Sequence, residues 1–195
     1  MQFNNHPEVA GSHAFLSASK YHWISWIRYD EEKIIETFTN AMAAARGTRL
    51  HAFAAEAIAL GQRLTKTQQT LNMYVNDAIS MRMKPEVLLF YTRNAFGTAD
   101  AISFRRERGH DKTVLRIHDL KTGTTKSNVN QLEIYAAFFC LEYDMPPHTI
   151  DIELRIYQND FIQIYIPDPE DILHIMDKLI TFDRLIDQAR QEALA

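Results

Sequence analysis

Two aspartates and a lysine near the middle of the chain have the types and spacing needed for metal-dependent chemistry. Asp100 lies in a segment with the alternation of a β-strand, residues 98–106, and Asp119 ends the next such segment, residues 113–120. The connection between the segments contains a glycine, which favours a β-hairpin. Lys121 follows Asp119 by two residues, so the period of a strand returns it to the same face.

A specific register follows if the hairpin is centred between Gly109 and His110. Asp100 then faces Asp119 at the end of an otherwise apolar face. The same register predicts two apolar pairs on that face, Ile102 with Ile117 and Phe104 with Leu115.

Two carboxylates that face each other repel, and burial raises the cost. Lys121 supplies one compensating charge, and a divalent ion bound to oxygen ligands would neutralise both carboxylates. Such an ion lowers the pKa of a bound water and stabilises charge on a phosphoryl group, while a lysine can orient that water or help to deprotonate it. The pattern therefore favours a metal site, with an Asp–Asp–Lys charge network at a frayed hairpin end as the alternative.

The order of the motifs around these residues resembles that of the PD-(D/E)XK nuclease superfamily. The segments 97–100 and 117–123 resemble its second and third motifs, with Asp119 where many members have glutamate. Gln131 and Tyr135 match the Gln-x-x-x-Tyr pattern of its RecB-like exonuclease branch.

Two upstream segments agree with the same branch. Gly47 to His51 resembles its Gly-x-x-x-His segment, and residues 16–20 resemble its serine-rich N-terminal motif. The similarity thus spans roughly residues 15–157 in the expected order. Cys140 is the single cysteine of the chain, so it cannot hold an iron–sulfur cluster, and the chain resembles the cluster-free, phage-type exonucleases.

The resemblance implies a DNA nuclease that hydrolyses phosphodiester bonds with a metal-activated water, most directly an exonuclease acting on DNA ends. Asp100, Asp119 and the backbone carbonyl of Leu120 would hold Mg²⁺ or Mn²⁺. His51 would add a nitrogen ligand that favours Mn²⁺, unless it is an ordinary helix histidine. Lys121 would act on the attacking water.

Four further residues are implied in substrate binding: Gln131, Tyr135, Lys126 and Ser19. Gln131 and Tyr135 lie one helical turn apart, where an amide and a phenol can hold a phosphate or sugar and stack on a base. The alternative for Tyr135 is packing in the core. Lys126 lies near a predicted helix start, which favours a phosphate contact. Glu56 and Glu86 are weaker candidates for the site.

Two other functions stay open: an endonuclease of the same fold, and a catalytically silent module that binds nucleic acid or a protein. The formal charge of -4 argues against a protein that coats nucleic acid nonspecifically. The expected partner is single- or double-stranded DNA, together with a possible protein partner in recombination. A cytoplasmic location is expected, because no segment approaches the length of a membrane-spanning helix, and the resemblance implies a bacterial or phage-infected host cell.

The N-terminal part of the chain reads mainly as helices. The expected segments are a short helix capped by Ser17 or Ser19 and running through Trp23 and Trp26, a helix over 31–45 broken by Gly47, a helix capped by Thr48 and running to about Leu60, and a helix over 66–80.

Strands dominate the rest of the chain. They are expected over 87–91, 98–106, 113–120, 150–157 and 161–166. Ser127 should cap a helix over 128–142, and Asp168 a final helix that begins at Pro169.

These elements predict an α/β (α+β) fold with a mixed central sheet flanked by helices and a helical N-terminal part. The resemblance implies that the core is restriction-endonuclease-like. With 195 residues, 46% of them hydrophobic, we expect one nuclease domain over residues 1–195. It would comprise a mainly helical part (1–83), a sheet core with an inserted helix (84–167) and a C-terminal helix (168–195).

Overall fold

The computed structural model describes residues 15–16, 31–107, 109, 111–125 and 127–193. Ser17, Ser19 and Lys126 lie outside the described residues, as does the helix expected through Trp23 and Trp26. The chain divides into two compact units, residues 1–46 and 47–195. The expectation that all of it forms one nuclease domain stays a prediction. In the first unit, the rings of Phe15 and Phe38 meet edge to face with centroids 5.4 Å apart.

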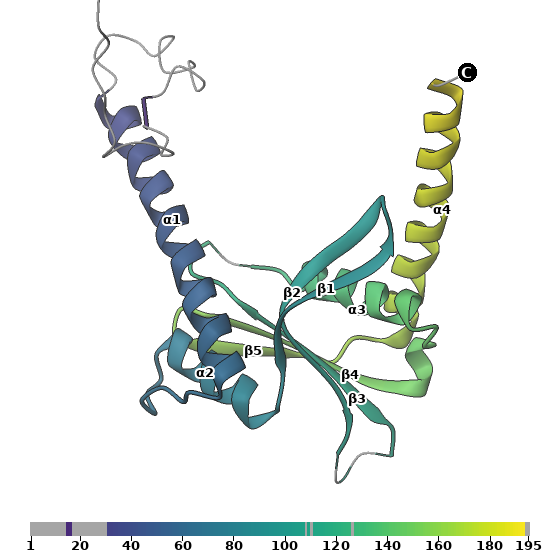
Figure 1. Ribbon diagram of the computed structural model, residues 1–195, viewed down its shortest axis with the longest axis horizontal. Coiled ribbons are helices and arrows are strands. Elements are labelled where there is room, and N and C mark those ends of the chain that lie inside the picture. The colour runs from purple at the N-terminus through teal and green to yellow at the C-terminus, as the bar shows by residue number, and fades with distance from the viewer. Residues whose placement is uncertain (1–14, 17–30, 108, 110, 126, 194–195) are drawn as a thin grey trace, which may run out of the picture. The chain divides into compact units, whose positions relative to one another are not determined.

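The second unit is built on a five-stranded mixed sheet in which the spatial order of the strands follows the sequence (Figure 1). The strands are β1 (Lys84–Thr92), β2 (Ala95–Arg106), β3 (Thr113–Leu120), β4 (Ile150–Gln158) and β5 (Phe161–Tyr165). Only β3 and β4 run parallel, and the crossover between them contains α3 (Asn130–Glu142) and a short 3-10 turn, η3 (Pro147–Thr149). The predicted mixed α/β class is confirmed.

Helices cover the sheet on both sides (Figure 1). On one side, α2 (Thr70–Ser80) and the end of α1 (Glu31–Leu60) bury an apolar cluster against Leu120 and Tyr157. On the other side, α3 packs on the larger cluster, which Ile172 of α4 (Pro169–Ala193) completes. Within the part of the chain that the structure describes, no helix is long and apolar enough to cross a membrane.

The predicted β2–β3 register is confirmed. Ile102 pairs with Ile117, and Phe104 pairs with Leu115. β3 has the predicted bounds, and all of its residues after Thr113 are buried because the strand lies in the centre of the sheet.

The predicted helix break at Gly47 is wrong, because α1 continues from Glu31 to Leu60 without interruption. Glycine inside a helix costs about 1 kcal/mol relative to alanine, and here a close contact explains its presence. A Cβ at Gly47 would lie only 2.7 Å from Oγ1 of Thr122, in the loop that follows β3. Gly47 therefore lets α1 approach the loop next to Lys121.

Two other helix starts differ from the prediction. α2 begins at Thr70 rather than Lys66, because the backbone N–H and hydroxyl of Thr70 both donate to Asp160 Oδ1 in the β4–β5 turn. Ser127 does not cap α3, since its backbone N–H instead donates to Gln158. The cap of α4 is confirmed, because Asp168 Oδ1 accepts the N–H of Glu170 at 3.0 Å.

We predict that Gly47→Ala and Thr122→Ala are coupled. In a Thr122→Ala background, Gly47→Ala should raise the free energy of unfolding by about 0.5–1 kcal/mol, through helix propensity alone. In the wild-type background the contact with Thr122 should cancel that gain. Urea unfolding of the four proteins measures the coupling, and strictly additive effects would contradict the close contact.

Candidate active site

Three acidic residues share one row across three neighbouring strands. The residues on either side of Glu86 in β1 pair with the residues on either side of Asp100 in β2, so Glu86 lies opposite Asp100. The β2–β3 ladder ends one row before Asp100 and Asp119. The predicted facing of Asp100 and Asp119 lies one row beyond the last β2–β3 pair, and Glu86 adds a third carboxylate to that row.

The backbone is irregular at this row. Glu86 has a backbone φ of 50°, a value that residues other than glycine rarely adopt. Neither Glu86 and Asp100 nor Asp100 and Asp119 form a ladder pair. Instead, Oδ2 of Asp100 accepts a hydrogen bond from the backbone N–H of Leu120 at 2.9 Å. A side-chain carboxylate therefore takes the place of a ladder bond where β2 and β3 separate.

His51 reaches the row from α1. Its Nδ1 lies 3.3 Å from Oδ2 of Asp100. One possible ligand atom from each of His51, Glu86 and Asp100 lies within 4.8 Å of the others. One nitrogen and two carboxylates at this separation could hold a divalent ion. Glu56 is exposed and does not belong to this group.

Asp119 is 2% exposed, and its two oxygens have different surroundings. Oδ1 lies 3.0 Å from Nζ of Lys121. Oδ2 is buried and has no hydrogen-bond partner among the described residues. A buried carboxylate oxygen without a donor is costly, and a cation would satisfy it. The residues present therefore fit a divalent ion better than a row closed by hydrogen bonds alone.

The backbone carbonyl of Leu120 is directed toward the same row. The N–H of Lys121 donates to the carbonyl of Tyr157 in β4. In a trans peptide the N–H and the preceding C=O point in opposite directions, so the Leu120 carbonyl points away from β4 toward the side of Asp100. This orientation suits the ligand role predicted for it.

Lys121 connects the row to α3. Its Nζ donates to Oε1 of Gln131 at 2.8 Å, and Nε2 of Gln131 donates to the hydroxyl of Tyr135 at 3.0 Å. Tyr135 also packs against β2, where a Cβ at Gly97 would lie 2.8 Å from its ring. Gln131 and Tyr135 are therefore brought to the predicted place, while Ser19 and Lys126 lie outside the described residues.

The electrostatics of the row reflect an excess of negative charge. The hydrogen bond to Asp100 raises the pKa of His51. Burial raises the pKa of Asp119, with the charge of Asp100 acting in the same direction and Lys121 opposing both. Burial and the charge of Asp100 likewise raise the pKa of Glu86. All three shifts favour a bound proton, which a cation would replace.

Glu86, a weaker candidate from the sequence, lies in the structure beside His51 and Asp100. The turn at Arg93 and Asn94 alone would set Val87 opposite Asp100, and the register shift between Phe90 and Thr92 sets Glu86 there instead. Neither this shift nor the left-handed backbone of Glu86 has a signal in the sequence.

Comparisons of the chain with protein-family models, with curated proteins and with solved structures found no match.

We predict that, without divalent ions, the row destabilises the protein as the pH rises. Asp119 and Glu86, with ordinary pKa values of 3.8 and 4.5, have raised pKa values when folded. The folded state therefore holds more protons than the unfolded state above about pH 4, and stability falls as those protons leave. His51 acts in the same sense above its ordinary value of 6.5.

The free energy of unfolding of the wild type and of a Glu86→Gln/Asp119→Asn variant is measured with urea in EDTA at a series of pH values above about 4. The difference between the two proteins isolates the effect of the two carboxylates. The stability of the wild type should fall relative to the variant as the pH rises, and millimolar Mg²⁺ should reduce the difference. A constant difference at all pH values would contradict the assignment.

A second prediction concerns the strained backbone at Glu86. Relative to Glu86→Ala, which removes the same carboxylate, Glu86→Gly should raise the free energy of unfolding by about 1 kcal/mol, because glycine adopts a positive φ without strain. Leu88→Gly is the matched control, since this exposed residue of β1 has an ordinary backbone, and its loss should lower stability by about 0.5–1 kcal/mol. Equal destabilisation by both changes would show that Glu86 stores no strain.

Proposed function

We propose that the protein is a divalent-metal-dependent deoxyribonuclease, most directly an exonuclease that hydrolyses phosphodiester bonds at DNA ends. The observation that carries the proposal is the row of Glu86, Asp100 and Asp119, with an unpartnered buried oxygen on Asp119 and a lysine beside it. A charge network without a cation would leave that oxygen unsatisfied. The order of motifs described from the sequence supports the same reading.

His51, Glu86 and Asp100, whose ligand atoms lie within 4.8 Å of one another, would hold Mg²⁺ or Mn²⁺. The unpartnered oxygen of Asp119 and the carbonyl of Leu120 would add further oxygen ligands. A bound divalent ion would supply the charge that lowers the pKa of water and stabilises the phosphate during displacement. The imidazole of His51 gives the site a nitrogen ligand, which favours Mn²⁺ relative to an all-oxygen site.

Lys121 would orient the attacking water and offset charge on the phosphate. Two acceptors hold its Nζ, Asp119 Oδ1 at 3.0 Å and Gln131 Oε1 at 2.8 Å, so the ammonium group is fixed beside the row. Attack of the water oxygen on phosphorus and breakage of the bond to the leaving sugar oxygen would complete the hydrolysis. The positive charge of Lys121 is most valuable while negative charge develops on the phosphate.

Gln131 and Tyr135 would position the DNA strand. Their side chains form one hydrogen-bonded unit with Lys121, and the phenol ring of Tyr135 is only half-buried. An amide and an aromatic ring at this place suit a phosphate and a base of the same nucleotide strand. A role in DNA recombination, with a protein partner in the cytoplasm of a bacterial or phage-infected host, belongs to the same proposal.

We predict that Asp119→Asn and Lys121→Ala each lower DNA cleavage by roughly a hundredfold or more while the fold is kept. The assay uses end-labelled linear DNA and covalently closed circular DNA, each with EDTA, Mg²⁺ or Mn²⁺. Asp171→Asn and Lys178→Ala, which change exposed residues of α4, are matched controls and should keep full activity.

Cleavage of linear DNA alone is the expected result. Cleavage of both substrates would replace the exonuclease with an endonuclease of the same site. Binding without cleavage in any metal would favour a silent DNA-binding module, and a folded Asp119→Asn variant with normal activity would refute the site.

A further inference from the structure

Strand β2 has an open edge at the end far from its turn with β1. Its pairing with β1 ends where Lys84 lies opposite Ile102, whereas β2 continues beside β3 to Arg106. Among the described residues, no strand pairs with the outer edge of β2 over residues 103–106. An open edge of this kind is a template for another strand.

The hydrogen-bonding groups on this edge follow from the ladder. The N–H of Leu120 points toward β2 and that of Lys121 toward β4, so alternate residues of β3 face β2. In β2, the residues that bond to β3 are then Ser103 and Arg105. Phe104 therefore directs its N–H and C=O groups to the open edge, and so does Arg106, the last residue of β2.

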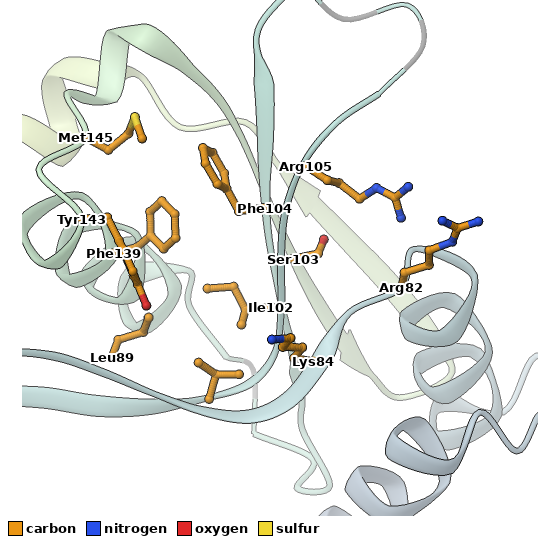
Figure 2. Close-up of a pocket in the computed structure, with 11 residues that line it drawn as sticks. Arg82, Lys84, Leu89, Ile102, Ser103, Phe104, Arg105, Phe139, Tyr143 and Met145 are labelled. Carbon is orange, nitrogen blue, oxygen red and sulfur yellow. The ribbon is translucent and has the colours of Figure 1, made fainter.

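A groove of about 690 Å³ follows the open edge and is lined from both faces of the sheet. Figure 2 shows Phe104, Phe139 and Tyr143 on one side of the strand, and Arg82 and Arg105 on the other. Phe104 and Phe139 contact each other with ring centroids 5.0 Å apart, and Phe139 contacts Tyr143 at 4.8 Å. One side of the groove is thus aromatic and the other basic.

The polar side of the groove has unused binding capacity. Ser103 is 8% exposed, and its hydroxyl lines the groove without a hydrogen-bond partner among the described residues. The guanidinium of Arg105 has a distant ion pair with Glu107, at 4.0 Å. Arg82 follows α2 with a φ of 52°, a conformation in which glycine is the usual residue. The arginine therefore occupies a position that is unfavourable for its own backbone.

We infer that this edge binds an extended segment of a partner protein as an additional β-strand, with alternating acidic and apolar side chains. The main chain of the segment would pair with Phe104 and Arg106. Successive side chains of a strand point to opposite faces, so its acidic residues would meet Arg82, Ser103 and Arg105 while its apolar residues meet the aromatic side.

Two other occupants fit these features less well. A second copy of this chain paired at the same edge would bring Arg105 and Arg106 near their own counterparts, and like charges oppose strand pairing. A nucleic-acid strand could use the basic side, but it lacks the regular main-chain donors and acceptors that a free strand edge requires.

The test uses three fluorescently labelled peptides of about eight residues, alternating Asp with Leu, Phe or Val. Binding to the full chain is measured by fluorescence anisotropy. At least one peptide should bind, and its analogue with N-methyl groups on alternate residues facing the edge should bind at least roughly tenfold more weakly, because it cannot donate to β2.

Matched variants locate the site. Arg106→Pro removes the N–H that faces the open edge and breaks no hydrogen bond to β3, so it should weaken peptide binding by roughly tenfold. Arg106→Ala keeps this N–H and should change peptide binding little. Arg82→Gly should keep or raise the melting temperature while weakening binding several-fold, because it relieves the backbone and removes a cation. These changes lie outside the row of carboxylates and should leave any cleavage of DNA unaltered.

Four results would overturn the inference: no binding of any peptide at millimolar concentration, equal binding of the N-methylated analogue, equal effects of Arg106→Pro and Arg106→Ala, or displacement of the peptide by a single-stranded oligonucleotide with equal affinity. Dimerisation of the unliganded chain that Arg106→Pro abolishes would also replace the partner segment with a second copy.

Discussion

Repulsion among the carboxylates of Glu86, Asp100 and Asp119 is the constraint on which the centre of the second unit depends. Regular strands would place these three charges side by side in one row. The backbone is irregular at this row: Glu86 adopts a left-handed conformation, and the side chain of Asp100 accepts a hydrogen bond from the N–H of Leu120. The groups that face these carboxylates are Lys121, directly after β3, and the imidazole of His51 from α1. One local contact, between Lys121 and Asp119, and one long-range contact, between His51 and Asp100, therefore act on the charge of this row.

Two glycines let the flanking helices reach the row. Gly47 is the point at which α1 approaches Thr122, one turn before His51, and Gly97 is the point at which the ring of Tyr135 lies against β2. In both cases a side chain would occupy the space that the neighbouring atoms already fill. These glycines serve close packing rather than turns, which explains why Gly47 stands inside a helix.

Local pattern was sufficient to predict the strands, because alternation along β1 and β4 reflects burial and β3 is a short apolar run, and the β2–β3 register followed from a hairpin. Local pattern was insufficient where a residue distant in sequence determines where a helix begins or ends. The glycine signal at Gly47 predicted a helix end, but the close approach of Thr122 explains it, and Thr70 begins α2 because Asp160 bonds to it across the fold. The pairing of Asp100 with the N–H of Leu120 could not be predicted, since a regular ladder was the better local expectation.

The charge of the row also has a consequence for the order of binding under the proposed function. A phosphate that approaches three carboxylates is repelled, and the chain as a whole carries a formal charge of -4. The positive charge of Lys121 alone cannot overcome this repulsion, because it is already paired with the carboxylate of Asp119. DNA should therefore bind well only when a divalent ion is present, and by reciprocity bound DNA should tighten the binding of the ion. The same repulsion that distorts the sheet thereby links the affinity for metal to the affinity for substrate.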